Sequence, residues 1–200
     1  MKIKNPTFIT SVALSKNFYQ TTKPIIAVCG KSNVGKSSLI NMLANMKKLA
    51  KTSVTPGRTR LINYFDFGEF VLADLPGYGF AKVSKEEKKK WGELLESFLS
   101  TQNIKLLLSL VDIRHQPTED DKMMINYLYH YAVPFNLIAT KADKLGKTKI
   151  KPRLKEISAD LRVGISDITA SSAENGYGRE EILNIIESAI SYNAESQENV

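Results

Sequence analysis

Hydrophobic residues along the chain fall into two patterns, short apolar runs and longer stretches in which apolar side chains recur every three or four residues. A short apolar run indicates a buried strand, and the longer period indicates one face of a helix. The alternation of the two patterns predicts an α/β fold: a three-layer sandwich with a mostly parallel sheet of six to seven strands, an antiparallel edge hairpin and helices on both faces. The strands are predicted at 7–13, 25–30, 62–67, 70–74, 105–113, 135–140 and 167–171, and the helices at 35 to 46–49, 84–100, 118–131, 150–163 and 180–192.

The length of the chain indicates its domain organisation. Two hundred residues suit one domain, and no linker or internal repeat divides them. We expect a single domain over residues 1–192, with its core at about 22–192. The polar tail at 193–200 is expected to fray.

Cysteine content and apolar run length bear on the compartment. A single cysteine, Cys29, excludes an internal disulfide framework and fits a reducing cytosol. The N-terminal residues lack the continuous apolar core of a signal peptide, and the longest apolar run, 106–111, is too short to span a bilayer. We therefore expect a cytoplasmic protein without a membrane-bound segment.

The most informative stretch follows the second predicted strand. An apolar run ends at Gly30, and after four further residues comes Gly35-Lys36-Ser37, the pattern G-x-x-x-x-G-K-[ST] between a buried strand and a helix. Such glycines let backbone N–H groups converge on one concavity that suits phosphate oxygens, and the helix N-terminus adds its positive dipole. Lys36 is expected to reach the β- and γ-phosphates, and the Ser37 hydroxyl to ligate Mg²⁺. The pattern predicts a nucleotide phosphate site, with a chance glycine-rich turn as the alternative.

A second motif, Asp74-Leu75-Pro76-Gly77, stands where the hairpin's second strand ends. Asp74 suits a carboxylate that holds Mg²⁺ through water, and the Gly77 N–H can meet the γ-phosphate. The preceding segment 51–60 is rich in proline, glycine and hydroxyl groups and is predicted to be a mobile loop. Thr59 in this loop can close onto Mg²⁺ through its hydroxyl and onto the γ-phosphate through its N–H. Thr52 and Thr55 compete for the same role.

Two further strand ends predict a pocket for a base. Asp143, in Thr140-Lys141-Ala142-Asp143, can accept hydrogen bonds from N1 and the exocyclic amine of guanine. Adenine presents an acceptor at N1 and leaves the carboxylate unpaired, and such buried mismatches discriminate strongly. Lys141 would pack its stem along the base. At the last strand end, the backbone N–H groups of 170–173 could meet the guanine O6.

The charge of the chain concerns partners rather than the fold. A net charge of +7 exceeds what nucleotide binding needs and indicates a polyanionic partner, RNA first and an anionic membrane surface second. Lysines gather beside the second motif and again between Lys141 and Lys155. These clusters are either ordinary solvated surfaces or a surface that faces RNA. The first cluster consists of Lys82, Lys85, Lys88, Lys89 and Lys90.

The motifs occur in the order found in small GTPases of the translation-factor class. Together they strongly resemble the bacterial EngB (YihA/YsxC) family over about residues 8–190, and the run 75–83 is the part most specific to that family. One departure is mild: an aromatic residue often precedes the Ser-Ser pair in the family, and Ala170 stands there. This affects the packing of the loop rather than its backbone contacts. The resemblance is carried by 30–37, 56–59, 74–81, 112–117 and 140–143.

The resemblance implies a Ras-like P-loop GTPase that binds GTP or GDP with Mg²⁺. It also implies a role in assembly of the large (50S) ribosomal subunit, with a precursor of that subunit or its rRNA as partner, and a requirement for normal cell division and septation. We expect a monomer. Carried over by position, Ser37 and Thr59 are the magnesium ligands, with Asp74 acting through water. The implied nucleotide contacts are Gly30, Lys31, Ser32, Asn33, Val34, Gly35, Lys36, Ser37, Gly57, Arg58, Thr59, Arg60, Leu61, Asp74, Leu75, Pro76, Gly77, Thr140, Lys141, Ala142, Asp143, Ala170, Ser171 and Ser172.

Hydrolysis is expected to depend on Lys36, Thr59 and Gly77. Ras-like enzymes orient the attacking water with a glutamine directly after D-x-x-G, and here Tyr78 stands at that position. The intrinsic rate is therefore expected to be slow, of the order of 10⁻⁴ to 10⁻² s⁻¹, unless a partner or a cation completes the site. In related GTPases an asparagine at the position of Asn33 helps bind potassium, which makes Asn33 a candidate potassium ligand. The loops 57–61 and 75–83 are the expected switches, ordered by GTP and released by GDP.

Three functions remain open at this point. The first is a GTP switch whose product is an assembled ribosomal particle, the second a GTPase that acts directly in septation, and the third a P-loop kinase. The chain has no obvious acceptor lid and has Asp143 as a guanine reader, which disfavours the kinase. Nothing in it looks like a membrane anchor or filament surface, so an effect on division is easier to interpret as a consequence of ribosome supply.

Overall fold

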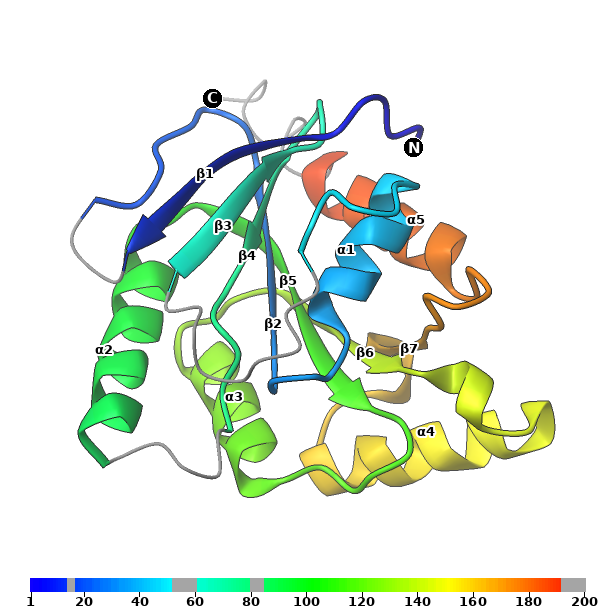
Figure 1. The fold of residues 1–200 in the computed structure, drawn as a ribbon. Coiled ribbons are helices and arrows are strands. Elements are labelled where there is room, and N and C mark those ends of the chain that lie inside the picture. Colours follow the sequence, from blue (N-terminus) through cyan, green and yellow to red (C-terminus); the bar gives the residue numbers. More distant parts are fainter. Residues whose placement is uncertain (14–16, 52–60, 80–84, 192–200) are drawn as a thin grey trace.

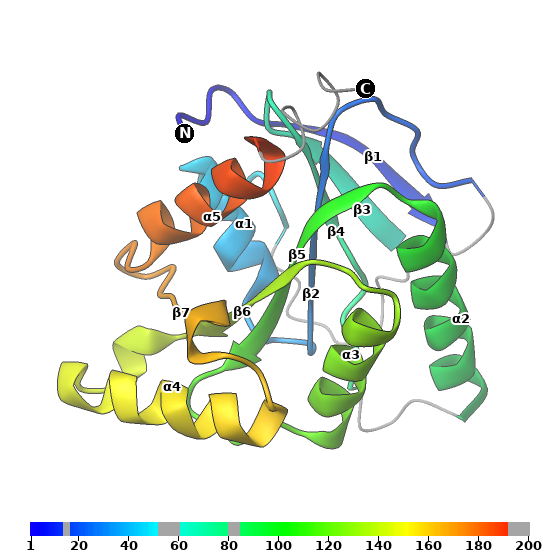
Figure 2. The ribbon, with the colours of Figure 1, turned by 180° about the vertical axis from the view of Figure 1, so that it is seen from behind.

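The computed structural model describes residues 1–13, 17–51, 61–79 and 85–191. Its centre is one sheet of seven strands in the order β1-β3-β4-β2-β5-β6-β7. Figures 1 and 2 show helices on both faces of this sheet, which confirms the predicted three-layer α/β sandwich. Every predicted strand is present. The strands are β1 (Thr7–Ala13), β2 (Ile25–Gly30), β3 (Leu61–Asp66), β4 (Val71–Asp74), β5 (Ile104–Asp112), β6 (Phe135–Thr140) and β7 (Ile168–Ala170).

The five strands that are adjacent in the sheet as β4, β2, β5, β6 and β7 run parallel to one another. Strand β3 is antiparallel to both of its neighbours, β1 and β4. The predicted hairpin of β3 and β4 is therefore present, and β1 pairs outside it at the edge of the sheet. Strand β2 is buried at all six residues between β4 and β5. A strand buried on both faces reads as a continuous apolar run, which is why the sequence pattern placed it correctly.

The two faces of the sheet carry separate cores. On one face α2, α3 and α4 pack over a cluster that includes Phe98, Leu128 and Ile157. On the other face α1 and α5 cover a cluster that includes Ile40 and Ile186. The helices are α1 (Lys36–Ala44), α2 (Lys85–Thr101), α3 (Glu119–His130), α4 (Lys147–Leu161) and α5 (Arg179–Ser191), with short 3₁₀ turns η1 (Ala142–Lys144) and η2 (Ile165–Asp167).

Two helix boundaries differ most from the prediction, and the others lie within two residues of it. Helix α1 ends at Ala44, before the predicted 46–49, because Asn45 adopts a left-handed conformation with φ of 53° and closes the helix. The side chain of Asn41 then holds the following turn through hydrogen bonds to the backbone N–H and carbonyl of Ala50. Helix α4 begins at Lys147, three residues before the predicted start. The prediction missed the first turn because that turn is polar and carries no apolar period.

The parallel strands bring their carboxyl ends to one edge of the sheet. In the ladder Val28 of β2 pairs with Asp74, and Gly30 pairs with Leu110 of β5. Further along, Asp112 pairs with Thr140. This is the edge at which open α/β sheets bind their ligands.

Candidate functional site

The loop after β2 passes very close to the sheet. A Cβ atom added at Gly30 would lie 2.8 Å from the Val34 Cγ1 and 2.9 Å from the Leu110 Cβ, so no larger residue fits there. Asn33 takes a left-handed conformation with φ of 63° and reverses the chain. The loop therefore turns back on itself before it enters α1.

The beginning of α1 presents free backbone donors to this loop. The first backbone bond into the helix runs from the Leu39 N–H to the Gly35 carbonyl at 2.9 Å. The preceding N–H groups, from Lys36 to Ser38, have no partner inside the helix. Gly35 also supplies no side-chain cap. Free donors and the positive end of the helix dipole suit an anion.

The segment Asp74–Gly77 lies against residues 30–37, which we call the phosphate loop because the sequence predicts a phosphate site there. A Cβ atom at Gly77 would be 2.9 Å from the Ser32 hydroxyl oxygen and 3.3 Å from the Lys36 Nζ. The next residue, Tyr78, accepts a hydrogen bond from the Ser32 N–H at 3.1 Å and donates its own N–H to Gly30. The structure thus brings together two motifs that are about forty residues apart in the sequence.

Asp74 is a buried carboxylate with an unused oxygen. Its Oδ1 has no hydrogen-bond partner among the described residues. Burial raises the pKa of Asp74, while the charge of Lys36 and a hydrogen bond from Asn63 act in the opposite direction. A buried, unsatisfied carboxylate oxygen is costly in a folded protein and commonly marks a place where water or an ion binds.

The Tyr78 side chain points into the core. Its hydroxyl donates a hydrogen bond to the Asp121 Oδ1 at 2.9 Å, and its ring packs edge-on against Trp91. Burial raises the pKa of Tyr78 well above its ordinary value. Trp91 in turn donates its indole N–H to the Pro76 carbonyl. The side chain that follows the Asp-x-x-Gly motif is therefore fixed in the interior and does not face the phosphate loop.

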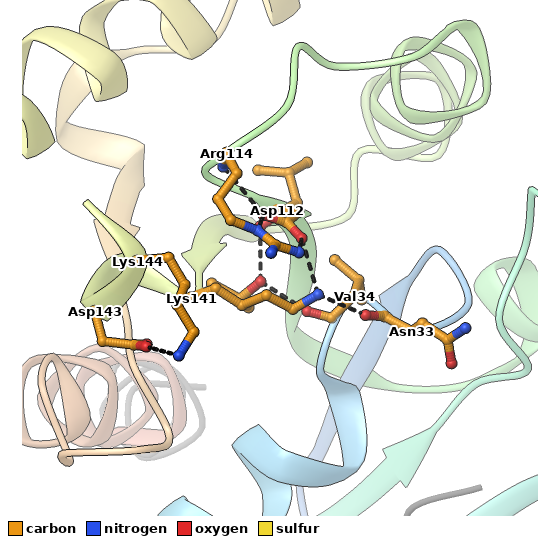
Figure 3. Close-up of polar contacts among 9 residues, drawn as sticks. Asn33, Val34, Asp112, Arg114, Lys141, Asp143 and Lys144 are labelled. Atoms are coloured by element: carbon orange, nitrogen blue, oxygen red, sulfur yellow. Dashed lines mark hydrogen bonds and ion pairs between the residues drawn. The ribbon is translucent and has the colours of Figure 1, made fainter. Parts of the chain in front are cut away.

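The end of β6 is tied to the phosphate loop by two side chains. The Thr140 hydroxyl oxygen lies 2.7 Å from the Val34 carbonyl and 3.0 Å from the Val111 carbonyl. The Lys141 Nζ donates to the Asn33 carbonyl and to the Asp112 carboxylate, both at 2.8 Å (Figure 3). The phosphate loop and residues 140–143, which we call the base motif because the sequence predicts that they bind the base, therefore form one connected unit.

Asp112 was not among the predicted site residues, although it lies at the centre of these contacts. It accepts three hydrogen bonds from Arg114, at 2.9 Å from Nε, 2.7 Å from a terminal nitrogen and 3.0 Å from the backbone N–H, in addition to the one from Lys141. Burial raises the pKa of Asp112, but the hydrogen bonds from Arg114 and Lys141 outweigh it and hold the pKa well below its usual range. The sequence signal that could have identified Asp112 was an acidic residue at the end of the central strand with a basic residue two positions later.

The base motif and the loop after β7 meet at Asp143. The Ser172 hydroxyl donates to one carboxylate oxygen at 2.6 Å, and the Lys144 ammonium lies 2.9 Å from the other. Both contacts lower the pKa of Asp143, so the carboxylate is ionised at neutral pH. Backbone bonds from Ala142 to Ser171 and from Ser171 to Ala139 fix the two segments side by side.

Two residues that support the loop after β7 belong to no motif, and their roles were not predicted from the sequence. Gly178 has a φ of +80°, and a Cβ atom there would overlap the carbonyl oxygen of Ala170. Arg179 donates to the carbonyls of Met42 and Leu43 and so caps the C-terminal end of α1. Single glycine and arginine residues have no pattern around them that would reveal such roles.

Several predicted residues lie outside the described part of the chain. These include Gly57, Arg58, Thr59 and Arg60, together with the competing Thr52 and Thr55, whereas Leu61 begins β3. The tail 193–200 and the end of the family-specific run, 80–83, also lie outside. Of the first lysine cluster, the structure describes the side chain of Lys89, which lies 3.8 Å from Glu93. Among the described helices, none has the length and apolar character needed to cross a bilayer.

A phosphate loop joined to an aspartate-containing base motif, at the carboxyl edge of a parallel sheet, is what P-loop GTPases share, and this chain is one of them. A family model described as "50S ribosome-binding GTPase" matches residues 25–141. The probable GTP-binding protein EngB of Pelotomaculum thermopropionicum is 47% identical over 189 residues, covering 93% of this chain and 96% of that protein. That of Clostridium kluyveri is 45% identical over 195 residues, covering 96% and 99%. The chain belongs to the EngB family of GTP-binding proteins, as its motifs predicted.

Solved structures show the same fold. A crystal structure of a probable GTP-binding protein EngB superposes with a TM-score of 0.70 at 24% identity, covering 84% of this chain and 99% of that one. A structure of Era in complex with MgGDPNP and nucleotides 1506–1542 of 16S ribosomal RNA gives a TM-score of 0.63 at 22% identity, covering 84% and 56%. At these identities the likeness concerns the fold alone.

Proposed function

We propose that this EngB family member is a Mg²⁺-dependent GTP switch that acts in assembly of the large ribosomal subunit. The observation that carries the proposal is the connected unit of phosphate loop and base motif, in which Lys141 bonds to Asn33 while Asp143 is held beside Ser172. Such a unit can report the state of a bound nucleotide to the surrounding loops. The description of the matching family, a 50S ribosome-binding GTPase, supports the choice of partner.

Guanine recognition is assigned to Asp143. Its ionised carboxylate can accept hydrogen bonds from N1 and the 2-amino group of guanine, and adenine would leave it unpaired. Lys144 and Ser172 hold the carboxylate in place from its other sides. The Ser171 and Ser172 N–H groups donate to the carbonyls of Ala139 and Tyr177. The contact to O6 is therefore assigned to the remaining backbone N–H groups of 170–173, and the aliphatic part of the Lys141 side chain to the face of the base.

Magnesium binding is assigned to the hydroxyls of Ser37 and Thr59, with Asp74 acting through a water molecule. The unpartnered Oδ1 of Asp74 fits such a water, and hydroxyl and carboxylate oxygens are ligands that Mg²⁺ accepts. The ion would neutralise charge on the β- and γ-phosphates. Lys36 would bind the same two phosphates as a fixed positive charge, and the remaining contacts would come from the loop N–H groups.

Hydrolysis is expected to be slow. Lys36 and the N–H groups of Thr59 and Gly77 can stabilise the γ-phosphate, but Tyr78 is buried against Asp121 and cannot orient water. By comparison with GTPases that lack an activating group, the intrinsic rate should be of the order of 10⁻⁴ to 10⁻² s⁻¹. Loops 57–61 and 75–83 are assigned as the switches. For the second loop the contact between Ser32 and Tyr78 supports the assignment, because it joins that loop to the phosphate site.

Potassium is proposed as a second cation at Asn33. The carbonyl of Asn33 binds Lys141, while its side chain is exposed at the rim of the phosphate loop. We expect GTP turnover to be several-fold faster in KCl than in NaCl, and Asn33→Ala to remove this difference without a change in GTP affinity in NaCl. Steady-state phosphate release in the two salts checks it. Equal turnover of the wild-type protein in both salts would contradict the assignment.

The ribosomal role is tested by binding to purified 50S subunits. We expect co-sedimentation of the full chain in the presence of a non-hydrolysable GTP analogue, several-fold weaker binding with GDP, and a steep decrease of both with salt. Binding that is independent of nucleotide and salt would contradict the proposal. We further propose that the protein acts in the cytoplasm as a monomer, and that its requirement for cell division and septation follows from the supply of ribosomes.

A further inference from the structure

The positive charge of the chain is concentrated beside the proposed guanine pocket. Residues 141–155 contain seven basic side chains and one acidic side chain, so these fifteen residues account for six of the seven net positive charges of the chain. The stretch starts in the base motif, passes through η1 and continues over more than half of α4. The rest of the chain is nearly neutral. A net charge this localised points to one particular surface.

Three of the seven basic residues have partners within the fold. Lys141 binds Asn33 and Asp112, and Lys144 pairs with Asp143. Arg153 donates to the Ile113 carbonyl at 2.9 Å and pairs with Glu156. The others are exposed lysines of α4, and the part of the chain that the structure describes places no carboxylate within ion-pair distance of them. These four are Lys147, Lys149, Lys151 and Lys155.

Three of the four lysines form a line along α4. Lys147, Lys151 and Lys155 follow one another at intervals of four residues, which stacks their side chains on one side of the helix. The helix buries Ile150 and Ile157 on a different side, against the core. Figures 1 and 2 show α4 on the outside of the molecule. We call Lys147, Lys151 and Lys155 the lysine stripe.

The lysine stripe opposes the stability of its own helix. Like charges four residues apart repel one another. Cations in the first turn also oppose the helix dipole, and the first turn of α4 contains no acidic residue and no side-chain cap. Helix α3 has the opposite arrangement, with three acidic residues in its first turn and a capping box. A segment that breaks a local rule followed elsewhere in the same chain is expected at a functional surface.

We infer that the lysine stripe binds the phosphodiester backbone of folded RNA. The stripe extends over about 12 Å of helix, given a rise of about 1.5 Å per residue. A nucleic-acid strand advances about 3.4 Å per phosphate, so three or four phosphates can face it. The inference rests on the proposed ribosomal function and identifies the surface that contacts RNA. Because η1 directly precedes α4, RNA bound there lies next to the residues assigned to guanine.

The test compares two triple variants of the full chain with equal loss of charge. One is Lys147→Gln/Lys151→Gln/Lys155→Gln, and the matched control is Lys4→Gln/Lys47→Gln/Lys48→Gln, which changes exposed lysines elsewhere. The probe is a fluorescein-labelled RNA duplex of twenty base pairs, titrated by polarisation at several KCl concentrations. The stripe variant should bind on the order of ten- to a hundredfold more weakly, and its log–log salt slope should fall by about 2 to 3. The control should bind like the wild-type protein.

The outcomes separate the surface from the proposed function. Unchanged duplex binding by the stripe variant, or an equal loss in the control, overturns the inference. So does a stripe variant that loses binding to phosphatidylglycerol vesicles but keeps the duplex. Co-sedimentation with 50S subunits provides the second arm: if the wild-type protein and the stripe variant bind subunits equally, the function stands and the surface is wrong. If neither binds subunits, the function itself fails. Removing like-charge repulsion should leave the melting temperature equal or higher, so unfolding does not explain lost binding.

Discussion

Replacing Asp143 by asparagine is expected to change the nucleotide preference from guanine to xanthine. The asparagine amide cannot accept both hydrogen bonds from guanine, but it can donate to the 2-oxo group of xanthine. Affinity for GTP should fall on the order of 10⁴-fold, because the buried partners are left unpaired, while XTP binding should rise to near the wild-type affinity for GTP. Competition titration with a fluorescent GDP or XDP measures both values.

The matched control for this change is Asp160→Asn, which neutralises an exposed aspartate of α4. Its nucleotide preference should equal that of the wild-type protein. Retained GTP affinity in Asp143→Asn would contradict the assignment of the base pocket. Loss of both nucleotides, with an unchanged melting temperature, would place the base elsewhere in the fold.

Replacing Asp74 by asparagine is expected to stabilise the nucleotide-free protein and to abolish the effect of Mg²⁺ on GTP binding. Burial raises the pKa of Asp74, so the folded state holds this proton more tightly than the unfolded state does. The stabilising effect of protonation is complete at a pH below the unfolded pKa and is lost as the pH rises through the folded pKa. The increase in the free energy of unfolding caused by Asp74→Asn should therefore be small near pH 4 and reach roughly 1–3 kcal/mol at pH 8, which is the usual cost of an unsatisfied buried group.

Urea unfolding at the two pH values and calorimetric GTP titration with and without Mg²⁺ measure these effects. Asp66→Asn is a control of opposite sign, because a hydrogen bond from Lys23 lowers the pKa of Asp66. Asp66→Asn should lose stability at pH 8 and keep the Mg²⁺ effect. If Asp74→Asn is less stable than the wild-type protein at both pH values and still responds to Mg²⁺, the proposed role of Asp74 is wrong.

Local sequence patterns predicted most of the fold because, along most of the chain, the local preference for a strand or a helix agrees with the element that forms. The buried strand Ile25–Gly30 and the acidic first turn of α3 are signals that need no knowledge of distant residues. The motifs of the site were found in the same way, because phosphate and base chemistry demand fixed residue types at fixed spacings. Membership of the EngB family followed from the order of these motifs.

The residues that were missed depend on tertiary contacts. Asp112 becomes important because Lys141 reaches it from the end of β6 and joins Arg114, two residues along the chain, on the same carboxylate. Gly178 becomes important because the backbone of Ala170 passes close to it. The early end of α1 has a local cause, because Asn45 adopts a left-handed conformation there, and the side chain of Asn41 then holds the following turn at Ala50. Lys141 lies 29 residues from Asp112 along the chain, outside the window over which a periodic pattern is read, and the contacts at Gly178 and Asn41 join residues that such a pattern does not pair.

The buried position of Tyr78 sharpens the view of this protein as a switch. The sequence indicated that a tyrosine cannot replace the glutamine of Ras-like enzymes. The structure adds that the side chain is used elsewhere, in a hydrogen bond to Asp121 that anchors the segment after Gly77 to α3. A change in this segment on GTP binding would therefore be felt at the N-terminal end of α3. The slow hydrolysis that we expect, and the anchoring of Tyr78 to α3, both suit a switch more than a metabolic enzyme.

We propose above all that the nucleotide in this pocket controls binding to the large ribosomal subunit. The most direct measurement is co-sedimentation of Asp143→Asn with 50S subunits in the presence of non-hydrolysable analogues of XTP or GTP. We expect binding of the variant with the XTP analogue to equal wild-type binding with the GTP analogue, and little binding of the variant with the GTP analogue. Equal binding of the variant with either analogue, or with no nucleotide, would show that the nucleotide in this pocket does not control subunit binding.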